Sequence, residues 1–367
     1  MKTWSLIVVF CLMINIPCFS QYSFVLNAFS ATLTGKKIYL SFMDFTTLRF
    51  VRVDSCVVTN NLIKMQGKMT QPASLVRFSV LHKGKSVASN FFLDSGINNF
   101  NMELINDRGL LKLQSNSKSN HIDNELKNIF NAKAASTKIN GYYQVTAALN
   151  SEIIAEQMKA LHAYKNNFTA ILSLYLIGKT TTNVGDAKKI LTTLAIFEDS
   201  IRNSEIGKKL YDEKLALITN TESSKIGNKV KEFVINDIDN KKFNNNDLKG
   251  QNYLIVFSAT WCGPCQEQLP RLKEIYKNYK SKGLKVVYFN NDDDVARWKK
   301  HVQLNKLDWI NVSERLKPSV SKIQKSFGVY AIPTCLLVNK DGMIVYNSDQ
   351  MDTELYQLET YIKKTLE

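Results

Sequence analysis

The first quarter of the chain consists of short hydrophobic runs separated by turn signals, at the spacing of β-strands. The runs are rich in β-branched and aromatic residues, and Thr34-Gly35 and Asp94-Ser95-Gly96 are among the turns between them. The runs are Tyr22–Phe29, Lys37–Phe42, Phe50–Val58, Leu62–Gly67, Ser74–Leu81 and Val87–Leu93. Short strands at near-regular spacing are typical of a sandwich. We therefore predict an N-terminal antiparallel β-sandwich over residues 21–115.

The next segment, residues 116–222, changes to the period of a helix. Its hydrophobic residues recur at helical spacing, for example at Ile153, Ile154 and Met158. Such spacing is typical of amphipathic helices that pack on each other or on a neighbouring domain. We interpret this helical middle region as a connector or as an arm through which a homodimer forms. The polar run Thr219–Asn228 predicts a hinge after it.

The last part of the chain, residues 226–367, alternates strand-like and helix-period segments. Strands are predicted at 252–258, 284–290, 309–312, 335–338 and 343–347, after a hairpin at 231–238 and 241–243. Helices are predicted at 262–280, 292–304, 318–327 and 353–366. This alternation predicts an α/β domain whose mixed sheet is covered on both faces.

A run of three carboxylates, Asp292-Asp293-Asp294, opens the second of these helices. Adjacent carboxylates can indicate a cation site. Carboxylates at the start of a helix also cap its free N–H groups and interact favourably with its dipole. We interpret the run as a helix cap.

The chain is basic, but its positive charge is spread along its whole length. Lysines and arginines number 48 against 33 acidic residues in 367, which gives a formal charge of +15. Lysines occur in scattered pairs such as Lys36-Lys37 and Lys299-Lys300, and no dense basic tract is interleaved with aromatic residues. This pattern favours a solvated basic surface. We predict no nucleic-acid partner.

The first 20 residues have the pattern of a secretory signal peptide. Lys2 precedes an apolar core, Ser5–Ile16, and Cys18 and Ser20 supply small residues for cleavage before Gln21. The core is too short to span a bilayer in the mature protein. Lipid anchoring through Cys18 is an alternative, but the residues before it fit a lipidation box poorly. Export implies a compartment in which disulfides persist.

The clearest chemistry is a pair of cysteines, Cys262 and Cys265, between an apolar run and a helix-period segment. A strand that ends where a helix begins places Cys262 at the helix N-terminus, where N–H groups and the dipole favour the thiolate. Cys265 lies three positions further on, so the two sulfurs can share a face and close a small disulfide ring. The arrangement predicts thiol–disulfide exchange, with Cys262 as nucleophile and Cys265 as the resolving cysteine.

Two other interpretations of this pair are weaker. Half of a zinc site would need a second pair of ligands, and neither another C-x-x-C nor an H-x-x-x-H follows. A purely structural disulfide over four residues would constrain little of the unfolded chain. We therefore predict no metal and no cofactor apart from the redox-active disulfide Cys262–Cys265.

Loss of the signal peptide leaves two further cysteines, Cys56 and Cys335. Both lie among apolar residues, in Cys56-Val-Val and Cys335-Leu-Leu. We interpret both as buried and inert thiols. A redox role for Cys335, which lies two residues after Pro333, is the minor alternative.

Residues from about Gly227 to Glu367 resemble the thioredoxin-fold domains of the periplasmic TlpA/ResA-like class. The resemblance rests on Trp261-Cys262-Gly263-Pro264-Cys265, on Pro270 five positions later and on Ile332-Pro333-Thr334 before a strand. The first region likewise resembles the small β domain that precedes thioredoxin domains in exported Bacteroidota proteins, in Val53-Asp54-Ser55 and the turn at 94–96.

This resemblance implies a thioredoxin fold and a periplasmic thiol-disulfide oxidoreductase. Trp261, Gly263 and Pro264 would shape the site together with Ile332 and a cis Pro333. The implied partners are exported protein thiols and disulfides, with a membrane thiol carrier as electron donor. The class also implies roles in redox homeostasis and cytochrome c maturation, and it favours reduction over oxidation.

The chain departs from the family pattern at three places, one of which is Lys231 in place of the proline usual in the opening G-x-x-x-P-x-F stretch. Thioredoxins carry a buried acid where this chain has Val256, an acid that the TlpA-like class usually lacks. Many members have glutamate where this chain has Gln268, with Glu267 beside it. We therefore consider Glu267 and Gln268 as candidates for tuning proton transfer at the sulfurs.

Two alternative functions belong to other classes. In a binding or assembly protein, the N-terminal regions would hold a partner and the redox domain would be secondary. A thiol peroxidase of this fold would need a P-x-x-x-[T/S]-x-x-C box. Ile255 and Ala259 occupy its required positions before Cys262, and Ser258 and Cys262 occupy those before Cys265, so neither cysteine completes the box.

Overall fold

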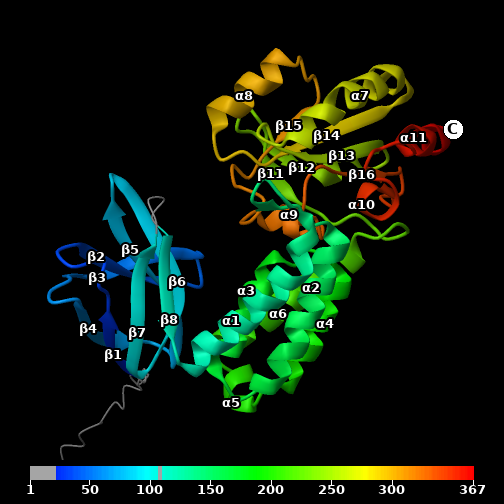
Figure 1. The fold of residues 1–367 in the computed structure, drawn as a ribbon. Helices are drawn as coiled ribbons and strands as arrows, with labels where there is room; N and C mark the ends of the chain where they lie inside the picture. The colour runs from blue at the N-terminus through cyan, green and yellow to red at the C-terminus, as the bar shows by residue number, and fades with distance from the viewer. Residues whose placement is uncertain (1–21, 106–109) are drawn as a thin grey trace, which may run out of the picture. The chain divides into compact units, whose positions relative to one another are not determined.

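The computed structural model describes residues 22–105 and 110–367 (Figure 1). The predicted signal peptide therefore lies outside the described residues. The chain forms two compact units. The first runs to Leu174 and includes 197–201, and the second comprises Tyr175–Ile196 and Arg202–Glu367. Over the described ranges, no helix combines the length and the apolar character needed to cross a membrane.

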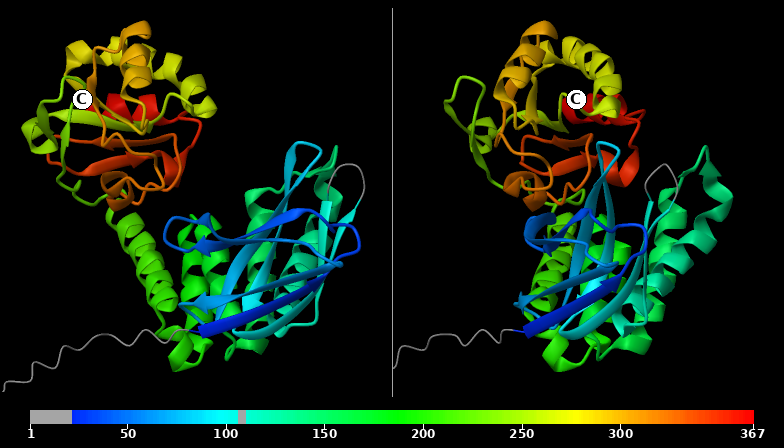
Figure 2. Two further views of the ribbon diagram at one scale, coloured as in Figure 1. Left: turned by 90° about the vertical axis from the view of Figure 1, so that its left-hand side faces the viewer. Right: turned by 60° about the vertical axis from the view of Figure 1, so that its left-hand side comes forward.

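Two four-stranded sheets form the β region of the first unit (Figures 1 and 2). One sheet has the order β4-β1-β7-β8 and the other β3-β2-β5-β6. The strands are β1 (Tyr22–Phe29), β2 (Lys37–Asp44), β3 (Arg49–Val57), β4 (Leu62–Met69), β5 (Ala73–His82), β6 (Lys85–Asp94), β7 (Gly96–Ile105) and β8 (Leu110–Ser115). A single hydrophobic core draws on both sheets, with Leu26, Phe78 and Phe100 among its buried residues. The predicted sandwich is thus confirmed.

One strand pair in this region departs from the antiparallel pattern. β1 and β7 run parallel, with Asn27 opposite Asn99. The other neighbouring strands in the two sheets are antiparallel. β1 and β7 are far apart in sequence, so the hydrophobic alternation of each strand leaves their relative direction open.

The middle of the chain is helical, as predicted. Its helices are α1 (Lys118–Ala134), α2 (Ala147–Leu161), α3 (Phe168–Thr180), α4 (Val184–Ile196), α5 (Asp199–Arg202) and α6 (Glu205–Ser223). Ser117, Thr146 and Ser204 cap α1, α2 and α6 by accepting a hydrogen bond from a first-turn N–H. α1 packs on α2 in the first unit, and α4 packs on α6 in the second. The boundary between the two units falls within α3.

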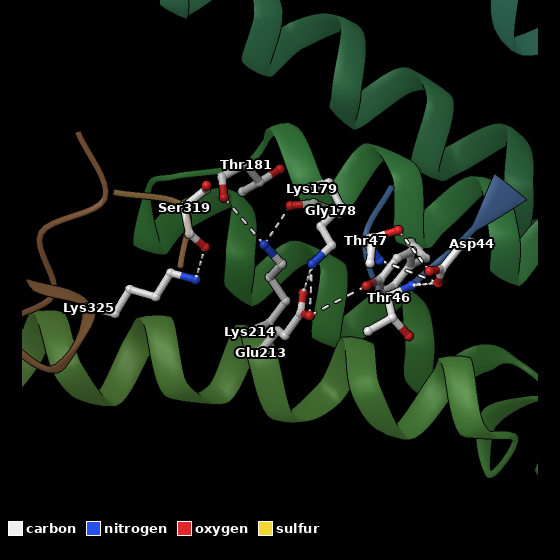
Figure 3. A network of polar contacts seen from close by, with 11 residues as sticks. Asp44, Thr46, Thr47, Gly178, Lys179, Thr181, Glu213, Lys214, Ser319 and Lys325 are labelled. Carbon is white, nitrogen blue, oxygen red and sulfur yellow. Dashed lines mark hydrogen bonds and ion pairs between the residues drawn. The ribbon is translucent and has the colours of Figure 1, made fainter. Parts of the chain in front are cut away.

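A buried lysine joins α6 to the end of α3 within the second unit (Figure 3). Lys214 is only 4% exposed, and its ammonium group donates hydrogen bonds to the carbonyl oxygens of Gly178 and Thr181. The neighbouring Glu213 is paired with Lys179 at 2.8 Å. Lys214 therefore gives the Gly178 carbonyl a second donor beside the N–H of Thr181, and it also satisfies the Thr181 carbonyl after the end of α3.

The rest of the second unit is a five-stranded sheet in the order β15-β14-β13-β16-β17, preceded by a small hairpin. β13 is parallel to β14, β14 is parallel to β15, and β16 is antiparallel to β13 and β17. The strands are β11 (Val234–Asn236), β12 (Lys242–Asn244), β13 (Asn252–Ser258), β14 (Leu284–Asn290), β15 (Ile310–Val312), β16 (Thr334–Val338) and β17 (Ile344–Asn347). The helices are α7 (Gly263–Tyr279), α8 (Val295–Leu304), α9 (Lys322–Ser326), α10 (Ser348–Met351) and α11 (Leu358–Leu366).

Both faces of this sheet are covered, as predicted. Alternate residues of β13 contribute to two separate cores: Leu254 and Val256 pack with residues of α7 and α11, and Tyr253, Ile255 and Phe257 pack with the hairpin and Phe327. This explains why all seven residues of β13 are buried. The mixed sheet and its two covered faces are those of a thioredoxin-like domain.

The segment predicted as a hinge is instead an ordered junction. α6 continues to Ser223, and its last turn packs against the loop that follows α9. Gly328 has φ +65°, and a Cβ atom there would lie 2.5 Å from the Cα atom of Thr221. Lys231 Nζ donates a hydrogen bond to Asn220 Oδ1 at 3.0 Å and another to the Ser326 carbonyl oxygen. The hinge prediction is wrong, because these contacts hold the segment in place. The contacts join residues that are distant in sequence, so the local pattern does not reveal them.

Candidate active site

The two cysteines lie where β13 ends and α7 begins. The buried strand ends at Ser258, and a short loop leads to Cys262, which is the N-cap of α7. Cys262 and Cys265 are joined by a disulfide bond. Pro264 is in the first turn of α7, where its missing N–H is not needed. The sequence therefore folds locally so that one sulfur caps the helix and the other lies inside its first turn.

The sulfur of Cys262 receives a backbone hydrogen bond. The N–H of Cys265 donates to Cys262 Sγ at 3.3 Å. Cys262 is 6% exposed and Cys265 is 3% exposed, so both are nearly enclosed and Cys262 is the more accessible. An N–H donor and the positive end of the helix dipole both favour negative charge on Cys262. This geometry suits a cysteine that attacks as a thiolate.

The loop before β16, which is distant from the cysteines in sequence, completes the site. The Ile332–Pro333 peptide bond is cis, as the resemblance predicted. The carbonyl oxygen of Ile332 lies 3.8 Å from Cys262 Sγ, and the Ile332 side chain packs on Ala259 and both cysteines. Residues about 70 positions apart in sequence therefore meet at the sulfurs.

The other predicted residues of the motif around the two cysteines are exposed to solvent. Trp261 is 49% exposed, although it directly precedes the nearly buried Cys262. Gly263 and Pro264 are also exposed. A large apolar side chain beside the sulfurs is available for contact with another molecule.

Glu267 and Gln268 occupy the first half of α7. Glu267 is exposed to solvent, and its side chain makes no hydrogen bond to a residue in the described part of the chain. Gln268 is half-buried and donates from Nε2 to the carbonyl oxygen of Thr353 at 2.7 Å. The contact of Gln268 therefore joins α7 to the segment after α10, and the proton-transfer role of both residues stays a prediction.

The two other cysteines are both outside the disulfide. Cys335 has no exposed surface, and burial strongly raises the pKa of its thiol, with the charge of Asp349 adding to the effect. Its inert character is therefore well supported. Cys56 is only half-buried, although burial also raises its pKa, so the prediction of a buried thiol holds for Cys56 only in part.

The three consecutive aspartates have three different roles. Asp294 caps α8 by accepting a hydrogen bond from the N–H of Arg297, so the predicted helix cap is correct for this residue. Asp293 is exposed and pairs with Lys317 at 3.2 Å. Asp292 is buried, at 2% exposure, and faces the loop that precedes Cys262.

Asp292 belongs to a polar contact set that the sequence analysis missed. Its carboxylate accepts from Thr260 N–H at 3.0 Å, from Thr260 Oγ1 at 2.7 Å and from Asn290 Nδ2 at 2.7 Å. Nearby, the hydroxyl of Tyr288 donates to Ser258 Oγ at 2.8 Å. The signal was available in principle, because Asp292 follows the end of β14 and the carboxyl ends of parallel neighbours meet at one edge.

Comparisons with known proteins agree with this geometry. A family model described as thioredoxin-like matches residues 250–344. The chain is 31% identical over 159 residues to the thiol-disulfide oxidoreductase ResA of Bacillus thuringiensis subsp. konkukian, which covers 43% of this chain and 87% of that protein. It is 34% identical over 100 residues to tryparedoxin of Trypanosoma brucei brucei, over 27% of this chain and 68% of that protein.

Among solved structures, the chain is similar to the thioredoxin domain of a thiol-disulfide oxidoreductase from Bacteroides vulgatus. The identity is 25% and the TM-score is 0.32. The match covers 36% of this chain and 97% of that one. The residues matched by the family model, 250–344, lie within the second unit of the chain.

Proposed function

The chain belongs to the family of thioredoxin-like thiol-disulfide oxidoreductases, and we propose that it is an exported member that reduces disulfide bonds of periplasmic proteins. The single observation that supports this most strongly is the disulfide at the start of α7, with one sulfur accepting an N–H hydrogen bond. The N-terminal pattern of residues 1–20 supports export. The exposed Trp261 beside the sulfurs supports contact with a protein substrate.

In the proposed reaction, Cys262 of the reduced enzyme attacks one sulfur of a substrate disulfide. A bond forms between Cys262 Sγ and that sulfur, the substrate disulfide breaks, and the second substrate sulfur leaves as a thiolate that takes up a proton. Cys265 then loses its proton and attacks Cys262 Sγ, which releases the first substrate sulfur as a thiolate. Two electrons have then passed to the substrate, and the enzyme holds the Cys262–Cys265 disulfide.

A thiol donor must then reduce this disulfide before the next turnover. In an exported protein, the donor we propose is a membrane thiol carrier, because the periplasm lacks a reducing thiol buffer. The direction of the reaction depends on the reduction potential of the cysteine pair relative to the substrate disulfide.

The first test is that potential, measured by equilibrating the full mature chain with glutathione and dithiothreitol buffers. A value near roughly −270 mV, as in thioredoxin, supports a reductant. A value near about −120 mV, as in a strong disulfide donor, contradicts the proposed direction. Absence of a reversible couple contradicts the whole proposal and favours the binding-protein alternative.

A second test identifies the attacking cysteine. The Cys265→Ala variant should accumulate a mixed disulfide with a protein substrate, because the resolving thiol is absent. The Cys262→Ala variant should form none, and non-reducing electrophoresis separates the two cases. A mixed disulfide that forms only in the Cys262→Ala variant would reverse the assigned roles.

A further inference from the structure

Asp292 is a buried carboxylate with neutral hydrogen-bond donors around it. Its contacts are the backbone and hydroxyl of Thr260 and the amide of Asn290. No ion pair to Asp292 occurs among the residues in 22–105 and 110–367. Burial of a carboxylate without a cation is costly, and three hydrogen bonds offset only part of that cost.

The contacts of Asp292 fix the segment that carries Cys262. Thr260 lies two residues before Cys262, and both of its donors, N–H and Oγ1–H, point to Asp292. The adjoining carbonyl groups are also held: Asn291 N–H donates to Ser258 O at 2.8 Å, and Gln266 Nε2 donates to Ala259 O at 2.8 Å. The loop between β13 and α7 is thereby tied to the end of β14.

The titratable groups near Asp292 do not cancel its charge. Burial lowers the pKa of His301 on α8, and the charge of Asp292 opposes this only in part, so the imidazole is neutral at pH 7. Burial raises the pKa of Tyr288 on β14 to about 12, so its phenol is also neutral. The Asp292 carboxylate thus lies against the N–H and hydroxyl of Thr260, two residues before the place where the Cys262 thiolate forms. Two like charges in a buried setting disfavour each other.

We propose that Asp292 is a positioning residue for thiol–disulfide exchange, which holds Thr260 and so aligns Cys262, and whose charge disfavours the reduced, thiolate form of the pair. This inference rests on the proposed function. It predicts that Asp292 makes the couple more reducing than it would otherwise be. It also predicts that Asp292 shifts the ionisation of Cys262 to higher pH without contacting the sulfur.

The test uses the full mature chain with Asp292→Asn, which keeps the side-chain size and one oxygen for the Thr260 N–H. The readouts are the pH dependence of iodoacetamide alkylation of reduced Cys262 and the equilibrium with glutathione. We expect the alkylation midpoint to move to lower pH, and the equilibrium to move at least threefold toward the dithiol. The matched control is Asp293→Asn, one residue away and exposed, which should change neither quantity by more than about twofold.

A second variant keeps the inference testable if Asp292→Asn does not fold. Thr260→Val removes the Oγ1–H donor but leaves the Asp292 carboxylate, so we expect the exchange rate with a disulfide substrate to fall several-fold. The inference is overturned if Asp292→Asn folds and has the wild-type alkylation midpoint and glutathione equilibrium. If Asp292→Asn does not fold, the inference is overturned when Thr260→Val exchanges at the wild-type rate. A wild-type chain without a reversible couple would instead refute the proposed function.

Discussion

Lys214 gives the second unit a stability that depends on pH in a direction unusual for a lysine with polar contacts. Burial lowers the pKa of its ammonium group from 10.5 to about 8, and the charge of Glu213 offsets this in part. The folded chain therefore holds this proton less tightly than the unfolded chain. Below pH 8 the charged lysine destabilises the fold by about 3 kcal/mol, from two and a half units at 1.36 kcal/mol each.

The sign of the pH effect follows from linkage. Between pH 8 and pH 10.5 the unfolded chain binds more protons at this site than the folded chain, so the contribution of Lys214 to stability rises with pH. From pH 7 to pH 9.5 the gain should be about 2 kcal/mol. The effect should be absent in Lys214→Met, which has a similar length and no charge.

The assay is urea unfolding of the wild-type chain and of Lys214→Met at pH 7 and pH 9.5, followed by circular dichroism. The difference in unfolding free energy between the wild type and Lys214→Met should shift in favour of the wild type by about 2 kcal/mol at the higher pH. The other titrating groups are common to both chains, so their contributions cancel in this difference. Lys208→Met, an exposed lysine on the same helix, is the control and should show no such shift. A difference that stays constant within about 0.5 kcal/mol would refute the reasoning.

Two further predictions concern the second unit. Gly328→Ala should lower its stability by about 2 kcal/mol or more in thermal unfolding, because a Cβ atom would overlap the backbone of Thr221 and the positive φ is strained as well. Gly342→Ala, with φ +77° and open space around it, is the matched control; an equal loss in both variants would show that the overlap is unimportant. In the reduced native chain, a maleimide should label Cys262 and leave the fully buried Cys335 unlabelled. Labelling of Cys335 as fast as that of Cys262 would show that it is accessible.

Local pattern was sufficient for most of the elements and for the sulfur pair. β13 was predicted at the residues where it lies, 252–258, because a run buried on both faces with clear flanking turns leaves little ambiguity. Cys262 was predicted at the start of a helix for the same reason. The cis bond before Pro333 came from the resemblance rather than from the local sequence.

The features that were missed depend on contacts between distant residues. The parallel pairing of β1 with β7 and the packing of Thr221 on Gly328 leave no periodic signal in either segment. Asp292 resembles its two neighbours in residue type, and its position just after the end of β14 is the one hint of its role in the sequence. Its burial against Thr260 is a tertiary property, and composition carries no information about it.

The junction between α6 and the loop before Pro333 has a consequence for work with fragments. A redox domain cut at residue 226 would lack Asn220 and Thr221, so Lys231 would lose one of its two acceptors and the backbone at Gly328 would be uncovered. That loop leads within five residues to the cis-proline beside the sulfurs. Kinetic constants measured on such a fragment would describe an altered enzyme, and a fusion that replaces α6 with a flexible linker would inherit the same defect.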